Sequence, residues 1–227
     1  MIKFNEVMGQ VEILNTNDSS GYKEIKPILG NSFESIKEFW NDLFGIQQLE
    51  KIVLTEEEYI DGVFNRDESE FSFDLDVKDS AVKKVLDCFD ENEWRLLTED
   101  EKFQVMDEFC HVLSEKLDIK RQPWLKLFED EWCYHGEYVP GVNMVKINRN
   151  ILNEPGEVIG TIAHEVRHAY QYQRACIGET KEDALYAYNF THYLEPQKFN
   201  GKYINFIDYQ NQLVEAEARA FAGLFQK

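Results

Sequence analysis

TIAHEVRHAY, residues 161–170, is the stretch from which the rest of the chain can be interpreted. Apolar residues recur along it and along the turn before it, which predicts a helix buried on most sides. In such a helix His164 and His168 lie on one face, one turn apart, so both imidazoles can reach one small ion. Glu165 is rotated from His164 by about 100° and could hold a water molecule beside that ion. Metal-assisted hydrolysis needs this arrangement of two histidines and one base.

A plainer alternative is a core helix whose two histidines only form hydrogen bonds with their neighbours. Histidine is scarce, with five in 227 residues. A chance match to the pattern is therefore expected in on the order of one per cent of chains of this size. We favour the metal site over the alternative.

The motif resembles that of the zincin metallopeptidases, and the resemblance covers about the last third of the chain. That family usually has uncharged residues around the motif, and Arg167 departs from this pattern. The resemblance implies a zinc-dependent peptidase with an α+β fold, in which a small sheet packs on the motif helix and a C-terminal helix carries the third ligand. An N-terminal α+β extension would precede it. The residues that comply are Thr161, Ile162, Val166, Ala169 and Tyr170.

The third metal ligand is sought in residues 209–222, which predict a strong helix containing Glu215 and Glu217 as its acidic residues. These two glutamates differ by about 200° around a helix and cannot serve the same face. Small residues such as Ala218 lie near Glu215 and would permit close approach to the motif helix, whereas the surroundings of Glu217 are bulkier. Many glutamate zincins similarly place a small residue three positions after the ligand. We prefer Glu215 as the third ligand and keep Glu217 as the alternative. At the position of Arg219 the family often has an acidic or amide residue that holds a histidine, so the residue with that role stays unassigned in this chain.

These residues suggest a mechanism. Glu165 would act as general base on a zinc-bound water molecule that attacks a peptide carbonyl, and it would then pass the proton to the leaving amine. Tyr209 is the first candidate for a donor to the oxyanion, and His192 is the second. The expected zinc ligands are His164, His168 and Glu215.

The remaining sequence predicts mostly regular elements, with a soft division into an N-terminal portion, residues 1–78, and a zincin-like portion, residues 79–227. One of the strands before the motif helix would, by the resemblance, pair with extended substrate; an ordinary hairpin covering the helix is the alternative. Helices are expected at 33–44, 79–89 and 98–117, and strands at 52–54, 71–77, 124–128, 132–138 and 144–148.

Composition limits the function further. A formal net charge of −19 disfavours nucleic acid and anionic membranes as partners. The N-terminus has no secretory signal pattern and the four cysteines have no zinc-site spacing, so a cytoplasmic location is expected, with leaderless export left open. A peptide or protein is the expected substrate. The competing hypotheses are an inactive zincin-like binding or regulatory protein and a toxin or effector protease with a narrow substrate; retention of Glu165 favours an enzyme. The oligomeric state cannot be inferred.

Overall fold

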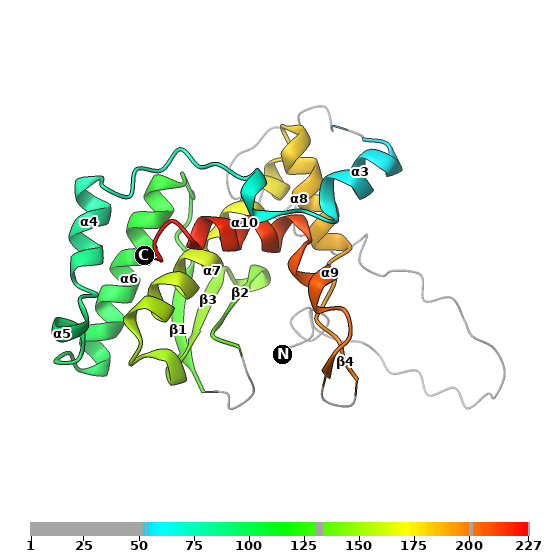
Figure 1. Cartoon of the computed structure of the whole chain (residues 1–227). Coiled ribbons are helices and arrows are strands. Elements are labelled where there is room, and N and C mark those ends of the chain that lie inside the picture. The colour runs from blue at the N-terminus through cyan, green and yellow to red at the C-terminus, as the bar shows by residue number, and fades with distance from the viewer. Residues whose placement is uncertain (1–51, 53, 130–133, 200–201, 227) are drawn as a thin grey trace, which may run out of the picture.

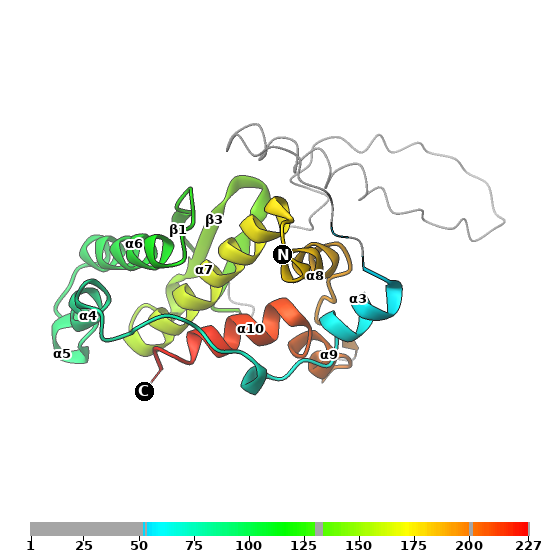
Figure 2. The same ribbon diagram turned by 90° about the horizontal axis from the view of Figure 1, so that it is seen from above.

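The computed structural model describes residues 52, 54–129, 134–199 and 202–226. The helix expected at 33–44 lies outside these residues. The described part has a mixed α+β architecture in which helix α7 (Pro155–Ile177) contacts a three-stranded sheet on one side and helix α10 (Leu213–Ala222) on the other (Figures 1 and 2). The expected α+β fold class is confirmed at this level.

Helix α7 contains the His-Glu-x-x-His motif and is buried along most of its length. Pro155 stands in its first turn, where its fixed φ angle suits a helix and its missing N–H costs nothing. Gly178 ends the helix in the left-handed conformation, with φ of 72°, a conformation that glycine adopts without a steric penalty. The motif helix predicted from the sequence is confirmed.

The sheet has the strand order β1-β3-β2. Strand β3 (Met144–Asn148) pairs in parallel with β1 (Trp124–Phe128) and antiparallel with β2 (Gly136–Val139). A short 3-10 turn, Pro140–Val142, connects β2 to β3, and Asn143 follows it with a left-handed φ of 49°. The strands predicted at 124–128 and 144–148 match the bounds of β1 and β3. The strand predicted at 132–138 begins only at Gly136 and ends one residue later than predicted, and positions 132 and 133 lie outside the described residues. Strand β2 is an outer strand of this sheet.

Side chains cap the starts of two helices before the sheet. Asp79 accepts hydrogen bonds from backbone N–H groups at the start of α4 (Ser80–Asp87). Thr98 and Glu101 form a capping box at the start of α6 (Glu99–Lys116). The helices expected at 79–89 and 98–117 are therefore present, each beginning one residue later than predicted.

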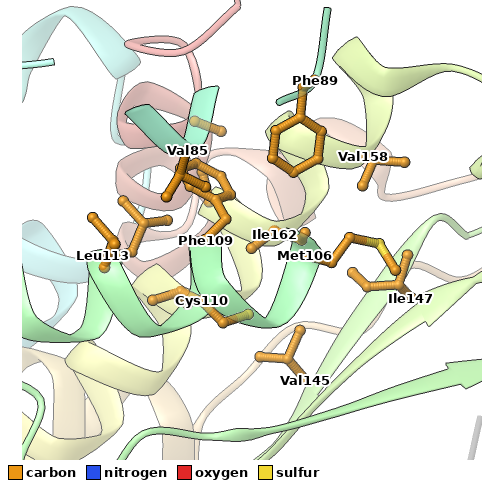
Figure 3. Close-up of a cluster of buried hydrophobic side chains, with 14 of the residues drawn as sticks. Val85, Phe89, Met106, Phe109, Cys110, Leu113, Val145, Ile147, Val158 and Ile162 are labelled. Atoms are coloured by element: carbon orange, nitrogen blue, oxygen red, sulfur yellow. The ribbon is translucent and has the colours of Figure 1, made fainter. Parts of the chain in front are cut away.

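A main hydrophobic core lies among α4, α6, α7 and the sheet (Figure 3). Trp94 of the short helix α5 (Glu91–Trp94) closes this core, and its indole N–H donates to the Leu152 carbonyl at 2.7 Å. Phe109 and Ile162 are fully buried, and each such side chain contributes about 1.5–3 kcal/mol through burial. The core therefore holds the first half of α7 against the sheet. The residues labelled in Figure 3 are Val85, Phe89, Met106, Phe109, Cys110, Leu113, Val145, Ile147, Val158 and Ile162.

Residues 54–77 differ from the prediction. The acidic stretch between the strands expected at 52–54 and 71–77 forms helix α3 (Glu56–Val63) and a 3-10 turn (Glu68–Glu70). The strand expected at 71–77 is absent. Side chains in 71–77 still alternate between half-buried and exposed, with Phe73 and Leu75 packed against the main core. The alternation thus reflects an extended segment lying on helices, and no strand among the described residues pairs with it. Residues 52 and 54 also lack regular structure.

A second core cluster supports the other half of α7. It includes residues of α3, α7, α10 and helix α8 (Lys181–Thr191). Val63, Tyr186 and Val214 are fully buried in it. Helix α7 is therefore held by different clusters along its length.

The C-terminal region is not one continuous helix. After the short strands β4 (Lys198–Phe199) and β5 (Lys202–Tyr203), helix α9 (Phe206–Gln210) is separated from α10 by a break at residues 211–212. Gln212 lies in the break with an extended backbone, and its buried amide bonds to backbone groups of Leu194 and to the Tyr209 carbonyl. The predicted single helix over residues 209–222 is wrong in this respect.

Within the described residues, no helix is both long and apolar enough to cross a lipid bilayer.

Candidate metal centre

The site forms where α10 lies against α7. His164 and His168 project from one face of α7, and Glu215 projects toward them from the first turn of α10. The Nε2 atoms of the two histidines are 3.1 Å apart. Glu215 Oε2 is 3.5 Å from His164 Nε2, and Glu215 Oε1 is 3.4 Å from His168 Nε2. The structure thus brings together the three residues expected as ligands, and they could hold a metal ion.

These separations suit a small divalent cation. Ligand atoms bound at about 2.0–2.1 Å in tetrahedral directions lie about 3.3 Å apart, close to the three distances observed. His168 and Glu215 are buried, while the side chain of His164 is 20% exposed. His164 is therefore the most exposed of the three side chains.

The ligand groups also perturb one another electrostatically. Burial opposes protonation of His168, but the Glu215 carboxylate outweighs it and raises the pKa of His168 to about 9. Burial alone would raise the pKa of Glu215, yet the two nearby histidines hold it well below its usual range. The metal-free site therefore favours an imidazolium beside a carboxylate, the charge pattern that a bound cation would replace.

Glu165 lies directly beside this group and is 7% exposed. Burial raises its pKa, and the nearby histidines offset part of that effect. Strand β2 passes over it: the backbone of Tyr138 donates a hydrogen bond to its carboxylate, and a Cβ added at Gly136 would lie 3.1 Å from Glu165 Cγ and would overlap the Thr161 side chain. Glycine at position 136 therefore lets the outer strand approach the motif helix.

Glu217, the alternative ligand, faces a different direction. Its carboxylate accepts hydrogen bonds from Arg167, from the Tyr186 hydroxyl at 2.8 Å and from Gln171 Nε2 at 2.7 Å. It forms a buried ion pair with Arg167, whose guanidinium also lies over three aromatic rings. These contacts account for the unusual charge at position 167. These contacts turn the Glu217 carboxylate toward Arg167, Tyr186 and Gln171, so it is not part of the group formed by His164, His168 and Glu215.

Two tyrosines, Tyr193 and Tyr209, lie close to Glu215. The Tyr193 hydroxyl donates to Glu215 Oε1 at 2.5 Å. Tyr209 meets Tyr193 edge to face, with ring centroids 6.1 Å apart. Burial, with the Glu215 carboxylate second, raises the pKa of both tyrosines. Tyr209 thus lies next to the site, on α9 and not on the helix of Glu215, and its role as an oxyanion donor stays a prediction.

His192 has a different setting. Its ring stacks on Tyr188 with centroids 3.9 Å apart, and Nδ1 lies 3.0 Å from both the Tyr188 carbonyl and the Thr191 hydroxyl. These contacts are with the end of α8. They give no support to a role of His192 at the ligand group.

Three features of the site were missed by sequence reasoning: the Tyr193 hydroxyl, the Gly136 contact and the Gln171 amide. Gln171 offered a signal, since it follows His168 by three residues on the same helix and such residues are neighbours. Its Oε1 lies 2.8 Å from His168 Nδ1. Tyr193 and Gly136 gave no comparable signal because both reach the site through tertiary contacts.

Comparison with known proteins finds no matching family model, no matching curated protein and no matching solved structure.

Proposed function

We propose that this protein is a zinc-dependent peptidase in which His164, His168 and Glu215 hold the metal. The observation that carries the proposal is the convergence of these ligand atoms, within 4.8 Å of one another, beside the buried carboxylate of Glu165. Two imidazoles and one carboxylate are a known ligand set for catalytic zinc, with a fourth position left for water or substrate. The resemblance to zincins rests on the same residues.

A zinc ion in such a site would lower the pKa of a coordinated water molecule to about 7 and polarise a carbonyl group. Glu165 is the general base. Its carboxylate takes a proton from the attacking water and returns it to the leaving amine.

Peptide as the substrate class is supported by strand β2. Among the described residues it is an outer strand, and its backbone lies against Glu165 at Gly136 and Tyr138. An extended peptide could add to such a strand through main-chain hydrogen bonds, and its carbonyl groups would then pass close to the base.

Metal content and hydrolysis test the proposal together. We expect one zinc per chain by elemental analysis in the wild type and in Glu165→Gln, and less than one-tenth of that in Glu215→Ala. With a fluorescence-quenched peptide library and casein as substrates, Glu165→Gln should lose at least a hundred-fold in rate. Glu157→Gln is the matched control, because Glu157 lies on the same helix but its side chain is 55% exposed.

Absence of zinc from the wild type after equilibration with the ion would overturn the proposal. So would equal hydrolysis by the wild type and Glu165→Gln, because the cleavage would then come from another source.

A further inference from the structure

Glu217 and Gln171 form a continuous hydrogen-bonded path to the metal-binding histidine. Glu217 Oε2 accepts from Gln171 Nε2, and Gln171 Oε1 faces His168 Nδ1 at 2.8 Å. Gln171 is fully buried and Glu217 is 2% exposed. The path therefore has no water to compete with its hydrogen bonds.

The partners of Gln171 fix the orientation of its amide. One side of the amide meets two groups that can only accept, the Glu217 carboxylate and the Val214 carbonyl at 3.1 Å. The nitrogen must face these acceptors, so the oxygen must face His168. Because an amide oxygen can only accept, His168 Nδ1 must carry a proton.

A protonated Nδ1 leaves Nε2 as the nitrogen that can bind a metal. His168 Nε2 is the atom that faces His164 and Glu215. We propose that Glu217 is a positioning residue that acts through Gln171, keeps the proton of His168 on Nδ1 and reserves Nε2 for the metal. This inference rests on the proposed function, and it gives Glu217 a role distinct from that of the ligand Glu215.

The other oxygen of Glu217 supplies a matched control. Tyr186 donates to Oε1, whereas Gln171 donates to Oε2. Tyr186→Phe removes a hydrogen bond from the same buried carboxylate without touching the path to His168. If zinc affinity fell only because the region around Glu217 became less stable, Tyr186→Phe and Gln171→Leu would both lower it. If it depends on the path to His168, only Gln171→Leu would lower it.

Two variants interrupt the path. In Gln171→Leu the acceptor for His168 Nδ1 is removed, while Glu217 keeps Arg167 and Tyr186. In Glu217→Gln the amide oxygen stays with the donor Arg167, so the new NH2 group faces Gln171 Nε2 in place of an acceptor, and only the Val214 carbonyl still favours the original orientation of Gln171. We expect zinc affinity, measured by competition with a chromophoric chelator, to fall roughly 10–100-fold in both and to change less than two-fold in Tyr186→Phe.

The second measurement follows the ring proton itself. Long-range ¹H–¹⁵N correlation spectra of metal-free and zinc-loaded wild type should show a His168 proton on Nδ1 that exchanges slowly with solvent. Tyr186→Phe should keep this signal and Gln171→Leu should lose its protection. If Glu217→Gln does not fold, the wild-type spectrum and Gln171→Leu decide the matter.

A His168 of the wild type that carries its proton only on Nε2 overturns the inference, as does a Gln171→Leu protein with unchanged zinc affinity. A wild type that binds no zinc would instead refute the proposed function, and the metal-free spectrum would still report the proton on Nδ1 separately.

Discussion

Removing the two glutamates of α10 one at a time should affect stability and zinc binding in opposite order: Glu217 matters more for stability and Glu215 more for zinc binding. Glu217 is 2% exposed and is the charged partner of Arg167, which is 7% exposed. Glu217→Ala leaves that guanidinium buried without its counter-charge and removes the acceptor for Tyr186 and Gln171. Breaking a buried ion pair from one side costs about 3–5 kcal/mol, so we expect a loss of about 4 kcal/mol in the free energy of unfolding.

Glu215→Ala should cost less in the metal-free protein. No buried charge is left unpaired, because the buried His168 can release its proton and the side chains of His164 and Tyr193 are partly exposed. A loss of about 2 kcal/mol is expected near pH 7, from the lost hydrogen bond of Tyr193 and the lost pairing with His168. Zinc binding should show the reverse order, with the larger loss in Glu215→Ala.

Urea unfolding of the metal-free proteins, followed by circular dichroism, measures the difference. For a chain of this size, about 4 kcal/mol corresponds to a decrease of about 10 °C in Tm. A double variant, Arg167→Met with Glu217→Met, should recover most of the loss, because removing both charges leaves neither unpaired. A Glu217→Ala protein within 1 kcal/mol of wild type, or a double variant less stable than the single one, would refute the reasoning.

Three further predictions concern the remaining groups of the site. Gly136→Ala should shift β2 away from Glu165 and reduce hydrolysis at least ten-fold with zinc content retained, at a cost of about 1–3 kcal/mol; unchanged rates would contradict the close approach. Tyr193→Phe removes the donor to Glu215 and should weaken zinc binding about ten-fold by chelator competition without unfolding the protein; wild-type affinity would show that this hydroxyl is dispensable. Because Glu215 raises the pKa of His168 from its ordinary 6.5 to about 9 against the effect of burial, the stabilising charge is fully present below pH 6.5 and is lost as the pH rises through 9. Urea midpoints of the metal-free protein should therefore decrease over that interval, and they should stay flat in a His168→Gln control.

Much of the motif helix and its ligands could be predicted from sequence because their signals are local. The helical spacing of His164 and His168 sets their relative position once the helix forms. Glu215 could be preferred over Glu217 because a short carboxylate needs small neighbours to approach another helix. The two prove to face different groups, as the 200° difference requires.

The errors came from long-range contacts. The alternation over 71–77 predicts a strand from its burial pattern alone, and only the packed helices reveal that no second strand pairs with it. At the break before α10, the side chain of Gln212 bonds to Leu194, 18 residues away, a contact that no local pattern indicates. Arg167 pairs with Glu217, 50 residues away. Because this partner is distant in sequence, the charge of Arg167 could be interpreted from the sequence only as a departure from the zincin pattern.

Helix α7 is held at its two halves by different hydrophobic clusters: His164 lies within the stretch held by the first cluster, between Ala163 and Val166, and His168 lies between the two clusters. The spacing of the two histidines is consequently set by the apoprotein and does not wait for an ion to draw the chain together. Metal uptake should then release little heat from folding. Removal of the metal with a chelator should likewise leave the protein folded and able to bind metal again, whereas small zinc domains unfold when they lose the metal.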